Sequence, residues 1–257
     1  MNTLVVHIDH RVAPGAESTV ATQVGEILSR PCFEVLARVA INVKERDRGH
    51  QSKTAVAVAA SLLASDSDAA DLDNGRQGEL IASARIWTGR HIETYDEPKP
   101  FLASYVVIPY NAETRTNTID AFIDLAAALH AVAGYITIER DYSDAHKVAL
   151  CSQPRAAQAR DFHRRAQERK GHYWYDKRVN AEISGPDWGI VLGPDHLRRL
   201  APDPAVFPII REAGASKVVF LSPDPADALT EAFDERLDAA RRALAPILMD
   251  LANVPLD

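Results

Sequence analysis

The pattern of hydrophobic and polar positions divides the chain into segments with strand-like or helix-like spacing. Short apolar or alternating runs are typical of strands, and they predict strands at residues 4–8, 33–43, 79–87, 104–109, 135–139, 187–192 and 217–221. Apolar residues three or four positions apart are typical of amphipathic helices, and they predict helices at residues 16–30, 51–64, 118–132, 158–170 and 224–244. The last of these has the most regular apolar face, formed by Leu229, Phe233, Leu237, Ala240 and Leu244.

The order of these elements indicates the fold class. Strands and helices do not alternate steadily, and no glycine-rich fingerprint joins them, so a parallel sheet is not favoured. We therefore expect an α+β fold, with an antiparallel or mixed sheet and helices packed mainly on one face. No long linker interrupts the chain, which predicts a single domain over residues 1–257, with two similar halves, 1–100 and 101–257, as an alternative division.

The segment 187–195, DWGIVLGPD, has the most distinctive pattern in the chain. A tryptophan followed by a run of aliphatic residues is typical of a buried strand, and Gly193-Pro194-Asp195 is typical of a helix start. Proline suits the first helical position because its missing N–H would have no partner there, and an acid in the first turn favours the helix dipole. We expect Trp188 to be a core residue where this strand meets a helix.

Residues 65–78 contain four aspartates, Asp66, Asp68, Asp71 and Asp73, without apolar periodicity. A calcium loop of the EF-hand type needs a central glycine in register and an acid at its twelfth position. This segment has neither, so we expect an exposed loop rather than a metal site.

Composition and charge restrict the classes of function. Hydrophobic residues make up 46% of the chain and charged residues 25%, which is ordinary for a folded protein. The net charge of −7 argues against a nucleic-acid binder, which usually has a basic face. The sequence shows no signal peptide or membrane-spanning run, and Cys32 and Cys151 make no disulfide framework or zinc motif. We expect a cytoplasmic protein without a membrane anchor, metal or cofactor.

Nucleophile-elbow, phosphate-loop, dinucleotide and zinc-protease motifs are missing from the sequence. Three polar residues that could form a site, His7, Asp9 and His10, lie together at the end of the first predicted strand. His7 and Asp9 project to the same face of a strand, as a metal or acid–base pair requires. The alternative is a strand that runs out into a polar turn.

The loop at residues 90–100 offers a second group, which includes His91, Glu93, Tyr95, Asp96 and Glu97. These side chains have the chemistry of acid–base groups lining a cleft. The alternative is a loop that binds a protein partner through Tyr95 and the surrounding acids.

Residues 154–178 are locally basic and end in the aromatic cluster Tyr173, Trp174 and Tyr175. Arginines beside aromatic rings are compatible with single-stranded nucleic acid, but the acidic balance of the chain disfavours that partner. Tyrosine, tryptophan and arginine are also enriched at protein–protein hot spots. We therefore predict partner-binding residues at Glu93, Tyr95, Asp96, Glu97, Tyr173 and Trp174.

The C-terminal part resembles the type VI immunity family of bacteria. The resemblance rests on DWGIVLGPDHL at 187–197, on the strand around Val218 and Val219, and on a final helix ending in RRALAP. It extends upstream to AVAGY at 131–135 and covers residues 100–250. The family has no catalytic residues to carry over, so Trp188, Gly189 and Leu192 correspond to fold residues.

The resemblance implies a cytoplasmic, non-enzymatic protein that binds and neutralises a cognate bacterial toxin. The alternative class is a hydrolase-like enzyme that uses His91, Glu93 and Asp96 in a cleft. A convergence of such groups in a pocket, within about 3 Å of one another, would distinguish it. A third class is a self-associating component of a phage or secretion apparatus.

Overall fold

A computed structural model describes residues 1–11, 15–36, 38–43, 46–51, 69–74, 81–87, 102–145, 182–183 and 185–248 of the chain. For residues 38–43 and 46–51 only the backbone is described. The fold and site below concern these residues.

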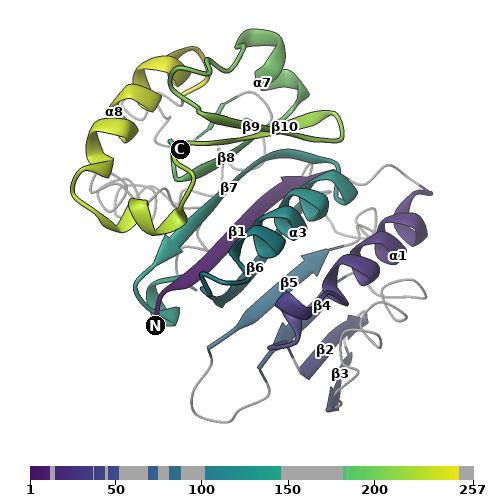
Figure 1. The fold of residues 1–257 in the computed structure, drawn as a ribbon. Coiled ribbons are helices and arrows are strands. Elements are labelled where there is room, and N and C mark those ends of the chain that lie inside the picture. The colour runs from purple at the N-terminus through teal and green to yellow at the C-terminus, as the bar shows by residue number, and fades with distance from the viewer. Residues whose placement is uncertain are drawn as a thin grey trace, which may run out of the picture.

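The protein is built on one ten-stranded sheet with the strand order β3-β2-β4-β5-β6-β1-β7-β8-β10-β9 (Figure 1). Every neighbouring pair in this sheet is antiparallel. The strands are β1 (Thr3–His10), β2 (Arg38–Val43), β3 (Arg46–Gln51), β4 (Ala69–Asp73), β5 (Ser83–Trp87), β6 (Leu102–Pro109), β7 (Ala131–Glu139), β8 (Gly189–Leu192), β9 (Ile209–Ala213) and β10 (Ser216–Phe220). The expected α+β class is confirmed, and the sheet is antiparallel rather than mixed.

Helices α1 and α3 pack side by side across one face of the sheet (Figure 1). The described helices are α1 (Glu17–Leu28), α3 (Arg115–Ala128), α7 (Pro194–Arg199) and α8 (Phe233–Leu244), with short 3-10 helices η1 (Pro31–Phe33), η3 (Pro225–Leu229) and η4 (Ala245–Ile247). Among them, none combines the length and the hydrophobicity that a membrane crossing requires.

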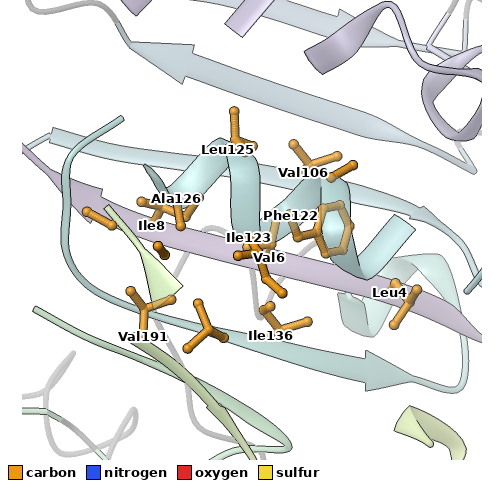
Figure 2. Packing of buried hydrophobic residues seen from close by; sticks show 14 of the residues in the cluster. Leu4, Val6, Ile8, Val106, Phe122, Ile123, Leu125, Ala126, Ile136 and Val191 are labelled. Atoms are coloured by element: carbon orange, nitrogen blue, oxygen red, sulfur yellow. The ribbon is translucent and has the colours of Figure 1, made fainter. Parts of the chain in front are cut away.

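The main core lies between this pair of helices and the central strands. Leu4, Val6 and Ile8 of β1 are at most 1% exposed, because alternate residues of a strand point to the same face. Figure 2 shows them packed with Phe122, Leu125 and other apolar residues of α3, and with Ile136 and Val191 from neighbouring strands. Burial of this apolar surface is the main stabilising contribution to the fold.

A strand followed by a helix occurs twice at the centre of the fold, as β1-α1 and as β6-α3. β1 lies between β6 and β7, which both follow residue 100, so the two parts of the chain share one sheet. The outer strands are ordered differently on the two sides of β1. Along the chain, β2 to β5 run from the edge of the sheet toward its centre, whereas β7 to β10 run from the centre toward the other edge. Similarity of two complete halves therefore stays a prediction.

The segment around Trp188 forms the predicted junction between strand and helix. Trp188 is 1% exposed, and its indole N–H donates to the carbonyl oxygen of Ser222 at 3.1 Å and to the Ser222 hydroxyl at 2.9 Å. Its ring packs on Phe220 with the ring centroids 4.7 Å apart. Gly193 has no room for a side chain, because a Cβ there would lie 2.0 Å from the carbonyl oxygen of Val132. Trp188 is thus a core residue, as predicted, and Pro194 begins α7.

Three element predictions in the first half need correction. Residues 69–73, placed in an exposed loop, form β4, which is paired on both sides. The strand predicted from residue 33 begins only at Arg38, after η1. Gln51 ends β3 rather than beginning a helix, and residues 52–64 of that predicted helix lie outside the described residues.

The later elements differ mainly at their ends. The helix predicted over 118–132 is α3, which stops at Ala128 because His130 takes a left-handed conformation with φ of 52° and β7 follows. Gly134 therefore lies inside β7 and does not end the helix. The final helix is divided into η3, capped by Asp224, and α8, whose apolar face is buried as expected. β9 is a strand that the sequence pattern did not predict, and the helix predicted at 158–170 lies outside the described residues.

Candidate functional site

The face of β1 that points away from α3 carries polar residues, although it is as buried as the apolar face. His7 is 2% exposed and Asp9 is 4% exposed. Both follow the same alternation as Val5, which belongs to a second, smaller hydrophobic cluster with Tyr105 and Tyr135. A buried polar layer of this kind must satisfy its hydrogen bonds internally.

Antiparallel register places five side chains in one line across five adjacent strands. We call this line the polar row. Asp71 of β4 lies opposite Arg85 of β5, Arg85 lies opposite Tyr105 of β6, and Tyr105 lies opposite His7 of β1. His7 in turn lies opposite Tyr135 of β7. Directly opposite residues share a face and have Cβ atoms about 4.5–5.5 Å apart, so the row is one continuous arrangement.

His7 of the polar row pairs with Asp9, which lies two residues further along β1 on the same face. Nε2 of His7 lies 3.2 Å from Oδ1 of Asp9, and the imidazole stacks on the Tyr135 ring with centroids 5.2 Å apart and planes 2° apart. The backbone beside it is tight, because a Cβ on Gly134 would lie 2.3 Å from the carbonyl oxygen of His7. These contacts hold the imidazole in one orientation, which a positioned acid–base group needs.

The other end of the row opens to solvent. Arg85 donates to Asp71 through Nε at 2.5 Å and through Nη2 at 3.0 Å, a two-pronged pairing. Their side chains are 41% and 36% exposed. The hydrogen bond to Asp71 raises the pKa of Arg85, and burial raises the pKa of Tyr105 to about 12. At neutral pH the row therefore presents the Arg85 guanidinium, paired with Asp71, and the neutral phenol of Tyr105.

A second histidine pair lies on the helix-covered face. Nε2 of His10 lies 2.8 Å from the Ser104 hydroxyl, which also accepts a hydrogen bond from the Trp87 backbone N–H at 3.0 Å. A serine beside a histidine has the geometry of an activated nucleophile, but both residues are 0% exposed. Burial lowers the pKa of His10 to about 3, and Nδ1 has no hydrogen-bond partner among the described residues. This pair is part of the core.

His196 has a structural role at the start of α7. Its Nδ1 accepts a hydrogen bond from the Gly193 backbone N–H at 3.2 Å, which satisfies a donor that the helix itself leaves unpaired. Burial lowers the pKa of His196 to about 4. Across the described ranges, no group of three or more His, Cys, Asp or Glu side chains is arranged to hold a metal ion.

The structure brings together His7 and Asp9 as the sequence predicted, and separates His10 from them onto the other face. The predicted partner-binding residues lie outside the described residues: Glu93, Tyr95, Asp96, Glu97, Tyr173 and Trp174. His91 lies outside them too. Tyr105, Tyr135 and Arg85 have no distinctive signal in the sequence, because their position beside His7 depends on strand pairing.

No protein-family model and no curated protein matches the chain. The solved structure of a Pseudomonas aeruginosa T6SS protein, PA0821, is similar to it, with a TM-score of 0.62 and 12% sequence identity. The similarity covers 96% of this chain and 73% of that protein. At this identity the similarity shows a shared fold, which extends through nearly the whole chain.

Proposed function

We propose that this chain is an immunity-type protein of type VI secretion, which binds and neutralises a cognate toxin by protein–protein contact in the cytoplasm of the producing cell. The observation that carries the proposal is the fold shared with a T6SS protein over 96% of the chain. The resemblance of residues 187–197 to the type VI immunity family points to the same class of protein.

The chemistry of the described residues is compatible with a binding function. The two histidine pairs are buried, and the conspicuous Trp188 segment contributes to the core rather than to a cleft. A protein that blocks a toxin needs a rigid scaffold and an exposed complementary surface, and a ten-stranded sheet with packed helices supplies the scaffold.

The proposed contact residues belong to two segments of the sequence. The acidic segment contains Glu93, Tyr95, Asp96 and Glu97, and the aromatic segment contains Tyr173 and Trp174. Carboxylates that face a basic toxin surface speed association and improve specificity. Tyrosine and tryptophan supply the large contact areas that dominate binding energy at hot spots.

A protection assay tests this proposal. The product of the neighbouring gene is expressed in a sensitive strain with and without this protein, and survival is counted. We expect full protection by the wild type and reduced protection by Glu93→Lys/Asp96→Lys. The matched control is Glu26→Lys/Glu113→Lys, which changes net charge equally at two exposed carboxylates of the described fold. Undiminished killing in the presence of soluble wild-type protein would contradict the proposal.

The His7–Asp9 pair favours a second candidate function, an enzyme that uses a histidine and an acid. Its Nε2–Oδ1 distance of 3.2 Å is within the reach expected of such a pair. A hydrolase screen with His7→Gln as the comparison tests this alternative. Turnover that His7→Gln removes, in a variant with an unchanged melting temperature, would favour the enzyme over the immunity protein.

A further inference from the structure

The strand β9 forms one edge of the sheet. It is the last strand in the order, and its residues Ile209–Ala213 pair only with β10 in the part of the chain that the structure describes. In an antiparallel pair, alternate residues turn their N–H and C=O groups away from the neighbour. An edge of this kind is a template for one more strand.

β10 and α3 hold β9 in place. Val218 and Val219 of β10 are fully buried beside it, and α3 packs against β9. The hairpin turn also rests on α3, because a Cβ on Gly214 would lie 3.8 Å from Cα of Ala127. A strand that is already ordered loses little conformational entropy when a partner binds.

The charges on β9 are only partly paired. Glu212 forms an ion pair with Lys217 across the hairpin at 3.0 Å. Arg211 is exposed, and no ion pair to it occurs within the described residues. Ile209 and Ile210 are half-buried at the same edge. A partner strand therefore meets an available guanidinium and two accessible isoleucines.

Self-pairing of two copies through β9 is disfavoured. A two-fold antiparallel pair places one residue opposite its own copy. Centring on Arg211 or on Glu212 sets like charges directly opposite each other, which destabilises the pair. Centring on Ile210 places Pro208 opposite Glu212, and proline has no N–H to donate.

We infer that an extended segment of the toxin adds to the sheet as a strand beside β9, with an acidic residue opposite Arg211. Strand addition uses backbone hydrogen bonds for affinity and alternate side chains for specificity. A carboxylate of the toxin opposite Arg211 forms an ion pair with its guanidinium. Apolar residues of the same toxin segment cover Ile209 and Ile210. This inference rests on the proposed function and adds the place and the chemistry of the contact.

Amide hydrogen exchange of the full chain, with and without the purified product of the neighbouring gene, tests the inference. In the free protein, we expect the outward amides of Ile209–Ala213 to exchange rapidly and those of the central strand β1 to be protected. We expect the β9 amides to slow at least tenfold in the complex.

A charge variant gives the second measurement. Arg211→Glu should weaken binding at least tenfold and leave the melting temperature unchanged, because the side chain is exposed. Arg140→Glu, which reverses an exposed arginine at the end of β7, is the matched control and should bind like the wild type.

The outcomes separate the two proposals. A complex that forms with unchanged β9 exchange and full affinity for Arg211→Glu overturns the strand addition and leaves the immunity function standing. Absence of any complex with the wild type overturns both. Protection of β9 amides that rises with the concentration of this protein alone identifies a second copy as the occupant and also overturns the inference.

Discussion

Replacement of Trp188 by phenylalanine tests whether the distinctive segment 187–197 acts in folding rather than in binding. The indole is 1% exposed and donates to both the carbonyl oxygen and the hydroxyl of Ser222. Phenylalanine keeps an aromatic ring beside Phe220 but removes this donor and part of the buried volume.

The expected loss of stability follows from these two changes. A buried acceptor left without its donor costs about 1–3 kcal/mol, and the smaller ring adds about 1 kcal/mol or more for the lost buried groups and the residual cavity. Trp188→Phe should therefore lower the free energy of unfolding by about 2–4 kcal/mol. Ser222→Ala, which removes the hydroxyl but keeps the carbonyl acceptor, should cost about 1 kcal/mol.

Urea unfolding followed by far-ultraviolet circular dichroism measures both variants without relying on the tryptophan that is removed. Without urea the Trp188→Phe variant should remain folded, and its affinity for a partner should then equal that of the wild type. A stability loss below about 0.5 kcal/mol would refute the assignment of the indole hydrogen bonds, given the range for buried groups. Weakened binding by a fully folded variant would refute the structural role.

Three further predictions concern the core, the histidines and the helix pair. Gly134→Ala should destabilise the protein strongly, since its Cβ would lie 2.3 Å from the carbonyl oxygen of His7, and soluble yield with a thermal melt checks this; an unchanged melt would contradict the close approach. The pKa values of His10 and His196 are lowered to about 3 and about 4, so unfolding favours proton uptake, and stability should fall by about 1.4 kcal/mol per pH unit for each histidine as pH drops below 6.5. Urea midpoints between pH 7 and 5 measure this slope, which should be shallower in His196→Gln, and a flat profile would contradict burial of the neutral rings. Arg30→Ala removes the ion pair between Arg30, which follows α1, and Asp124 of α3. Their side chains are 39% and 50% exposed, so the change should cost less than about 1 kcal/mol and less still at high salt; a larger loss would show that the pair holds this segment on α3.

The sequence predicted best those elements that depend on interactions between neighbouring residues of the chain. The apolar face of α8 and the proline at the start of α7 were both recognisable, because helix periodicity and end signals occupy neighbouring residues. Burial of Trp188 was equally predictable from its flanking strand. The shared face of His7 and Asp9 followed from their spacing of two residues in one strand, whereas their contact was one of two alternatives.

Elements that depend on pairing could not be predicted in the same way. β4 reads AADLD, and aspartate is depleted in strands, so only its partners β2 and β5 and the contact of Asp71 with Arg85 make the strand favourable. The polar row needs the register of five strands, and strand register is not encoded within any one of them. The close approach of Gly134 to His7 is likewise invisible in the sequence, because it exists only when β1 lies beside β7.

Capture of the tagged protein from its native cells, with its partners identified by mass spectrometry, tests the central claim most directly. The immunity function predicts one stoichiometric partner, encoded by the neighbouring gene, that kills cells when it is expressed alone. Recovery of the protein without such a partner, or with a partner that is harmless on its own, would contradict the claim.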